Sequence, residues 1–128
     1  MPNTVVDLVA RAKAQVENLT PDQVARERAE GAVLVDLREP AELQNDGIIE
    51  GAIHAPRGML EFYADPNSPY HKDALDPSSR TILYCASGGR SALGAVALAE
   101  LGYADVAHLD GGIKAWRADG RPLTAPGS

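Results

Sequence analysis

The protein has 128 residues, of which 45% are hydrophobic and 23% are charged, a composition typical of one globular domain that can bury its own core. Its net charge of −6 argues against a nucleic-acid partner, which would require a basic surface. Its single cysteine, Cys85, excludes an intramolecular disulfide framework, a cysteine-rich metal site and dithiol chemistry within one chain. We therefore expect no metal and no cofactor.

The N-terminal residues 1–18 predict an amphipathic helix. Apolar side chains recur on one face of it, at Val5, Leu8, Val9, Ala12 and Val16. We expect this face to pack on the rest of the chain, with a homodimer formed through the helix as the alternative. The segment has neither the apolar run of a signal peptide nor that of a membrane span, so we predict no membrane association and a cytoplasmic protein.

Helices and strands alternate along the remaining sequence. A second helix starts at Thr20, where Pro21 and Gln23 complete a capping box, and ends before Gly31. Buried strands are predicted at residues 32–36, 81–84 and 105–109, a weaker one at 51–54, and helices at 90–101 and 113–119. The excursion over 57–79 contains a short helical piece near 59–62 and then a turn, and residues 124–128 predict a frayed tail. This order indicates an α/β domain with a mostly parallel sheet.

The strongest functional signal is the loop between the strand at 81–84 and the following helix. It begins at Cys85 and continues through Ala86, Ser87, Gly88, Gly89 and Arg90. Tight glycine turns at a helix N-terminus point backbone N–H groups inward and form an anion cradle, which would stabilise a thiolate at Cys85. Arg90 adds a positive charge, so the loop predicts a nucleophilic thiolate beside an oxyanion site. The alternative is that Cys85 is simply a small buried apolar residue.

Other side chains are expected on the same rim, because ligands of parallel sheets bind beyond the carboxyl ends of the strands. Asp36 and Arg38 are predicted to form a structural pair, and Asp110 to cap the last helix. Arg57 and Ser91 are candidates for the substrate mouth. Trp116 is expected in the core, and His54 and His108 are expected to be hydrogen-bonded residues of the fold.

Four segments together resemble a single-domain rhodanese of the sulfurtransferase family. They are residues 33–39, residues 47–54, the Cys85 loop, and residues 109–112 with Ala115, Trp116 and Gly120. The resemblance gives a rhodanese-like domain at 19–123, preceded by the helix of 1–18 and followed by the tail of 124–128. It implies a central parallel five-stranded sheet flanked by helices on both faces.

The resemblance also implies a chemistry. Cys85 would take a sulfane sulfur from thiosulfate or a similar donor, hold it as a persulfide, and pass it to cyanide or a thiol. The amides of the loop would stabilise the sulfur anion, and Arg90 would hold the donor's oxygens. The implied partners are a small anionic sulfur donor, a thiophilic acceptor and, in the alternative, a protein that receives the sulfur.

Two alternatives remain on the same fold. One is a persulfide carrier or interaction module whose partner is another protein. The other is a phosphatase or arsenate reductase, which is less favoured because phosphatase relatives have five residues between Cys and Arg, whereas four separate Cys85 from Arg90. The absence of a second cysteine also argues against an arsenate reductase that resolves its own intermediate.

Overall fold

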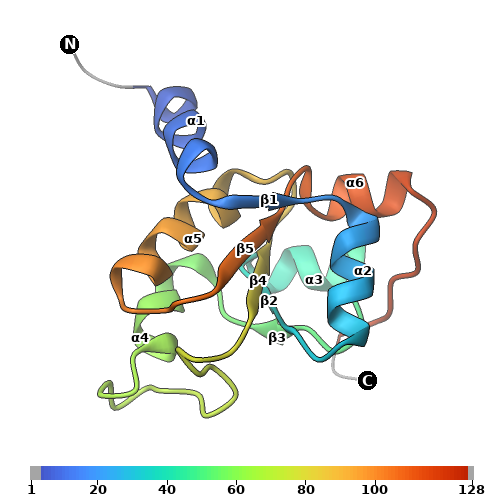
Figure 1. Cartoon of the computed structure of the whole chain (residues 1–128). Helices are drawn as coiled ribbons and strands as arrows, with labels where there is room; N and C mark the ends of the chain where they lie inside the picture. The colour runs from blue at the N-terminus through green and yellow to red at the C-terminus, as the bar shows by residue number, and fades with distance from the viewer. Residues whose placement is uncertain (1–3, 127–128) are drawn as a thin grey trace.

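The fold is built on one parallel sheet of five strands, in the order β1-β5-β4-β2-β3 (Figure 1). The computed structural model describes residues 4–126. The strands are β1 (Glu17–Leu19), β2 (Val33–Asp36), β3 (Ile53–His54), β4 (Thr81–Tyr84) and β5 (Val106–Leu109). The helices are α1 (Val5–Gln15), α2 (Pro21–Ala29), α3 (Pro40–Asp46), the 3₁₀ turn η1 (Arg57–Met59), α4 (Leu60–Ala64), α5 (Gly89–Glu100) and α6 (Gly112–Ala118).

Helices cover both faces of the sheet, with α1, α4 and α5 on one side and α2, α3 and α6 on the other (Figure 1). Each face has its own apolar cluster. Leu83 of β4 packs with Leu60 and Leu98 on the first face, while Ile82 packs with Val24 and Trp116 on the second. Successive residues of a strand point to opposite faces, so this continuous apolar run serves both clusters. The predicted α/β class and five-stranded parallel sheet are confirmed.

Local signals in the sequence account for several element boundaries. The Thr20 hydroxyl accepts a hydrogen bond from Gln23 N, as the capping box predicts. The short helical piece near 59–62 is confirmed by η1 and α4. The prediction that Asp110 caps the last helix is wrong. The N-cap is Gly111, whose φ of 82° lies in the left-handed region that glycine adopts readily, and no side chain caps this helix.

The C-terminal residues depart from the predicted frayed tail at its first position. Thr124 forms an antiparallel bridge with Ile48, in which each backbone N–H donates to the other's carbonyl at 2.8 Å. The small polar side chain of Thr124 led to the prediction of a frayed tail. The residue is instead held in place by its two reciprocal backbone hydrogen bonds. Residues 127–128 lie outside the described part of the chain. Within residues 4–126, no helix has the length and apolar character needed to cross a bilayer.

Candidate active site

Cys85 lies at the end of β4, at the mouth of a tight loop that leads into α5. Its Sγ accepts hydrogen bonds from the backbone N–H groups of Gly88, at 3.2 Å, and Ser91, at 3.4 Å. Gly88 has φ 107° and forms the N-cap of α5, a backbone conformation that a residue with a Cβ rarely adopts. The predicted cradle is therefore present, and the Cys85 side chain is 1% exposed within it.

The loop is held from behind by the start of α6. Ile113 N donates to the carbonyl of Cys85 at 2.9 Å, and Lys114 N donates to that of Ala86 at 3.1 Å. The two backbones are so close that a Cβ on Gly112 would lie 2.5 Å from the Cys85 carbonyl oxygen. Because the carbonyls are engaged behind the loop, its N–H groups remain directed toward the sulfur.

Arg90 forms an ion pair with Glu42, which the sequence analysis did not identify. The two guanidinium N–H groups donate to the two carboxylate oxygens at 2.7 and 2.9 Å. Hydrogen bonds from Arg90 lower the pKa of Glu42 to about 2. The carboxylate comes from α3, a helix with only one buried residue, Leu43, so apolar periodicity gave no sign of it.

Asp36 and Arg38 form the structural pair that the sequence predicted. Arg38 donates to Asp36 through its backbone N and Nε, both at 3.0 Å, and through Nη2 at 2.8 Å. Nη2 also donates to the carbonyl of Gly47 at 2.8 Å, at the end of α3. Both side chains are buried, so the pair fixes the position of the helix that carries Glu42.

Lys13 of α1 brings a second cation to the loop. Its Nζ lies 3.0 Å from Asp110 Oδ1, and both groups border Gly88. The ion pair with Lys13 lowers the pKa of Asp110. The two cations beside the cradle, Lys13 and Arg90, are therefore each neutralised by a carboxylate. No pattern in the sequence indicates that Lys13 lies at the loop, because its position there depends on how α1 packs.

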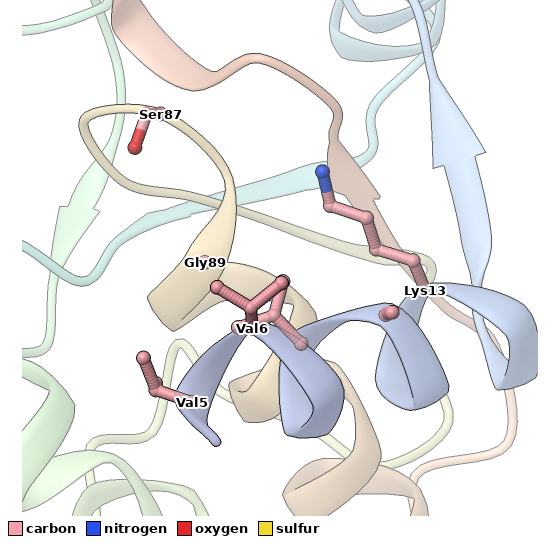
Figure 2. Close-up of a pocket in the computed structure, with 7 residues that line it drawn as sticks. Val5, Val6, Lys13, Ser87 and Gly89 are labelled. Carbon is pink, nitrogen blue, oxygen red and sulfur yellow. The ribbon is translucent and has the colours of Figure 1, made fainter.

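An open apolar pocket of about 390 Å³ separates α1 from the Cys85 loop. Figure 2 shows Val5, Val6 and Lys13 on the helix and Ser87 and Gly89 on the loop. Val5, in the predicted apolar face of this helix, is 67% exposed, so that face is only partly used for packing on the domain; Val6, outside that face, is 72% exposed. The remainder faces solvent beside the candidate site.

Comparison with known proteins places this geometry in a family. Residues 20–119 match the Rhodanese-like domain. The chain belongs to the rhodanese family. A sulfurtransferase of Allochromatium vinosum is 34% identical over 76% of this rhodanese chain and 82% of its own length. The thiosulfate sulfurtransferase GlpE of Ectopseudomonas mendocina is 33% identical over 90% of this chain and 97% of its own.

A solved structure resembles this rhodanese over almost its whole length. It is a Rhodopseudomonas palustris protein, described as being of unknown function and a possible tyrosine phosphatase. It is 38% identical, covers 96% of this chain and 98% of its own, and superposes with a TM-score of 0.87. The match includes the region of α1, outside the matched domain of 20–119.

The remaining predicted residues of the rhodanese lie in different environments. Arg57 pairs with Glu61 at 2.8 Å, so its charge is already compensated, and its place at the substrate mouth stays a prediction. Ser91 is fully buried, and its Oγ lies 3.6 Å from Cys85 Sγ. It therefore lies beneath the thiol rather than at the mouth, because α5 turns its first inward-facing residue toward the sheet. Trp116 is in the core, as predicted.

Proposed function

We propose that this rhodanese-like protein is a sulfurtransferase of the thiosulfate type. The observation that carries the proposal is the single thiol held inside a cradle of backbone N–H groups, at 3.2 and 3.4 Å. Such a cradle stabilises a negative charge on Cys85 Sγ and on the outer sulfur of a persulfide formed there. The curated relatives named sulfurtransferases support the same chemistry.

In this mechanism the Cys85 thiolate attacks the outer sulfur of thiosulfate. A new S–S bond forms as the old one breaks, and sulfite leaves with the electron pair. Cyanide or a thiolate then attacks the outer sulfur of the persulfide, and the Cys85 thiolate is released. Arg90 gives up its two hydrogen bonds to the Glu42 carboxylate and donates to the oxygens of the sulfur donor instead. The exchange is possible because a guanidinium binds a carboxylate and an oxyanion in the same bidentate way.

The description of one structural relative as a possible tyrosine phosphatase raises the alternative of phosphoryl transfer. The loop of this chain has four residues between Cys85 and Arg90. Its N–H groups already converge on Sγ, with Gly88 N at 3.2 Å. This small ring suits one sulfur atom better than the three oxygens of a phosphoryl group, so sulfur transfer is the better-supported chemistry.

A protein-partnered persulfide carrier is the second candidate, and the apolar pocket beside the loop favours it. A volume of about 390 Å³ far exceeds what a small inorganic donor requires, and Val6 is largely exposed in its wall. A polypeptide with an apolar segment next to its own persulfide would fit there. Val6→Asp should then slow loading from a protein persulfide but not from thiosulfate, whereas Phe62→Asp, at a 51% exposed residue of α4, should change neither.

The deciding experiment follows sulfur on the protein itself. The intact mass is recorded after incubation with thiosulfate, and cyanide is then added and thiocyanate assayed. We expect a gain of one sulfur atom that cyanide removes, and no gain in Cys85→Ser. Loading by a protein persulfide without loading by thiosulfate would favour the carrier. Hydrolysis of a phosphate ester without any sulfur gain would refute both.

A further inference from the structure

A chain of polar side chains leads away from the sulfur through Ser91, the residue that also supplies one of the two N–H groups. Cys85 Sγ lies 3.6 Å from Ser91 Oγ, and Ser91 Oγ lies 2.8 Å from His108 Nδ1. His108 Nε2 lies 2.7 Å from Asn18 Oδ1. Ser91 and His108 are both 0% exposed. The sulfurtransferase chemistry described above does not use His108, which is a buried base connected to the nucleophile.

The hydrogen bonds of Asn18 fix the direction of the whole chain. Its amide Nδ2 donates to the carbonyls of Lys13, at 2.9 Å, and Val16, at 3.0 Å, which places its Oδ1 against the imidazole. His108 Nε2 must therefore carry a proton, since Oδ1 can only accept. Burial lowers the pKa of His108, so the ring is neutral and its Nδ1 is an acceptor.

The direction at the sulfur follows from this tautomer. Ser91 donates its hydroxyl proton to His108 Nδ1, which leaves only lone pairs of Ser91 Oγ facing Cys85. The neutral thiol is therefore the donor and Ser91 the acceptor of the contact at 3.6 Å. Along the path from Cys85 through Ser91 to His108, each hydrogen-bond donor points toward the histidine. Proton transfer from the thiol to the imidazole requires this arrangement.

We propose that Ser91 and His108 remove the proton of Cys85 and so form the thiolate that attacks a sulfur donor. The S–H bond breaks as Ser91 Oγ takes that proton, and the hydroxyl proton of Ser91 moves to His108 Nδ1. The imidazolium then donates to Ser91 Oγ and to Asn18 Oδ1, and the Ser91 hydroxyl, which now carries the former thiol proton, donates to the sulfur anion. The proton returns along the same path when the acceptor has removed the sulfur and the thiolate is re-formed. The inference rests on the proposed role of Cys85 as the nucleophile.

The charges around His108 leave it able to gain and lose a proton. Asp110, two residues along the chain, favours the imidazolium, whereas Lys13 of α1 disfavours it. These two side chains pair with each other at 3.0 Å, so their opposite effects largely offset. The neighbouring strands present Asn18, from β1, and Leu83, from β4, at the positions in register with His108, and α5 presents Ser91. A thiolate at Cys85, once formed, would also favour the imidazolium.

The test measures alkylation of Cys85 by iodoacetamide as a function of pH, which needs no sulfur donor. Ser91→Ala removes the intermediate hydroxyl, and His108→Asn keeps an acceptor for Ser91 but cannot take a proton. At neutral pH we expect each variant to react roughly tenfold more slowly than the wild type, with half-maximal rate shifted upward by about one pH unit. At alkaline pH, where the thiol is already ionised, all three should reach the same rate. Ser78→Ala and His71→Asn, in the excursion after α4, serve as matched controls.

Wild-type rates at neutral pH in both variants would overturn the proposal. So would a loss that persists undiminished at alkaline pH, because that is the effect of damaged packing. If the variants do not fold, ¹⁵N NMR of the wild type decides, since a His108 ring protonated at Nδ1 in the thiol form cannot accept the proton. Failure of the sulfurtransferase proposal is distinguishable, because it appears as no sulfur gain from thiosulfate while alkylation keeps its pH profile.

Discussion

Asp36→Asn tests the ion pair that fixes the rim of the site. In the wild type, the Asp36 carboxylate accepts three hydrogen bonds from Arg38, at 3.0, 3.0 and 2.8 Å. The amide retains one oxygen for two of these bonds but turns its NH₂ group toward Arg38 Nη2, so two donors face each other. Loss of a charge-assisted bond costs about 1.5–3 kcal/mol. Arg38, which is 0% exposed, also loses its nearer counter-charge and keeps only Asp46, at 4.0 Å.

Together these effects should lower the free energy of unfolding by about 3–5 kcal/mol, the usual consequence of breaking a buried pair. Urea unfolding followed by the fluorescence of Trp116, the single tryptophan, measures this directly. Asp22→Asn is the matched control, because Asp22 is 62% exposed and pairs with Arg26 and Arg121 at the surface. It should cost about 1 kcal/mol or less. Equal losses in the two variants would refute the reasoning.

Three further predictions concern α3 and the core. Glu42→Gln should lower the KM for thiosulfate in the cyanide assay, because Arg90 no longer has to leave a carboxylate; an unchanged or higher KM would contradict this. The pKa of Glu42 is depressed to about 2 in the folded protein, so its ion pair with Arg90 stabilises the fold at pH values above the ordinary glutamate pKa. This contribution to the free energy of unfolding is lost as the pH falls from about 5 to about 2. The stability difference between wild type and Glu42→Gln should therefore vanish over that range in urea titrations, and a constant difference would be inconsistent with the pair. Gly94→Ala should destabilise by about 1–3 kcal/mol, since its Cβ would lie 2.8 Å from Leu37 Cδ1, whereas Gly58→Ala, with open space around it, should change little.

Much of the sheet could be predicted because its central strands are short apolar runs with clear limits. Residues 81–84 match β4, and the predicted strands at 32–36 and 105–109 differ from β2 and β5 by one residue. The capping box at Thr20 fixed the start of α2 equally well. In these places local backbone preference and burial favour the same structure, so a single sequence is sufficient.

Shorter elements escaped prediction for physical reasons. The edge strand β1 has three residues, of which only Leu19 is buried, so it depends on pairing with β5 rather than on its own pattern. In α3, Pro40 begins the helix and Leu43 is the only buried residue, too few for a periodic signal.

Around Cys85, the residues that are close to it in the sequence could be predicted, whereas those that reach it from distant parts of the chain could not. The loop from Cys85 to Arg90 is continuous, and its glycines and helix start carry the signal for the cradle. Glu42 and Lys13 reach it from other helices, and nothing in their own surroundings indicates the contact. His108 was expected to be hydrogen-bonded, which is confirmed, but its connection to the sulfur depends on the register between β4 and β5.

The support that α6 gives to the Cys85 loop also has a consequence for protein synthesis. The N–H groups of Ile113 and Lys114 that hold the carbonyls of Cys85 and Ala86 belong to residues made long after the cysteine itself. On the ribosome these two hydrogen bonds can therefore form only after residue 114 has emerged, when nearly all of the matched domain has been made. The backbone geometry of the loop that holds Cys85 is thus completed by the last helix of the described chain to be synthesised.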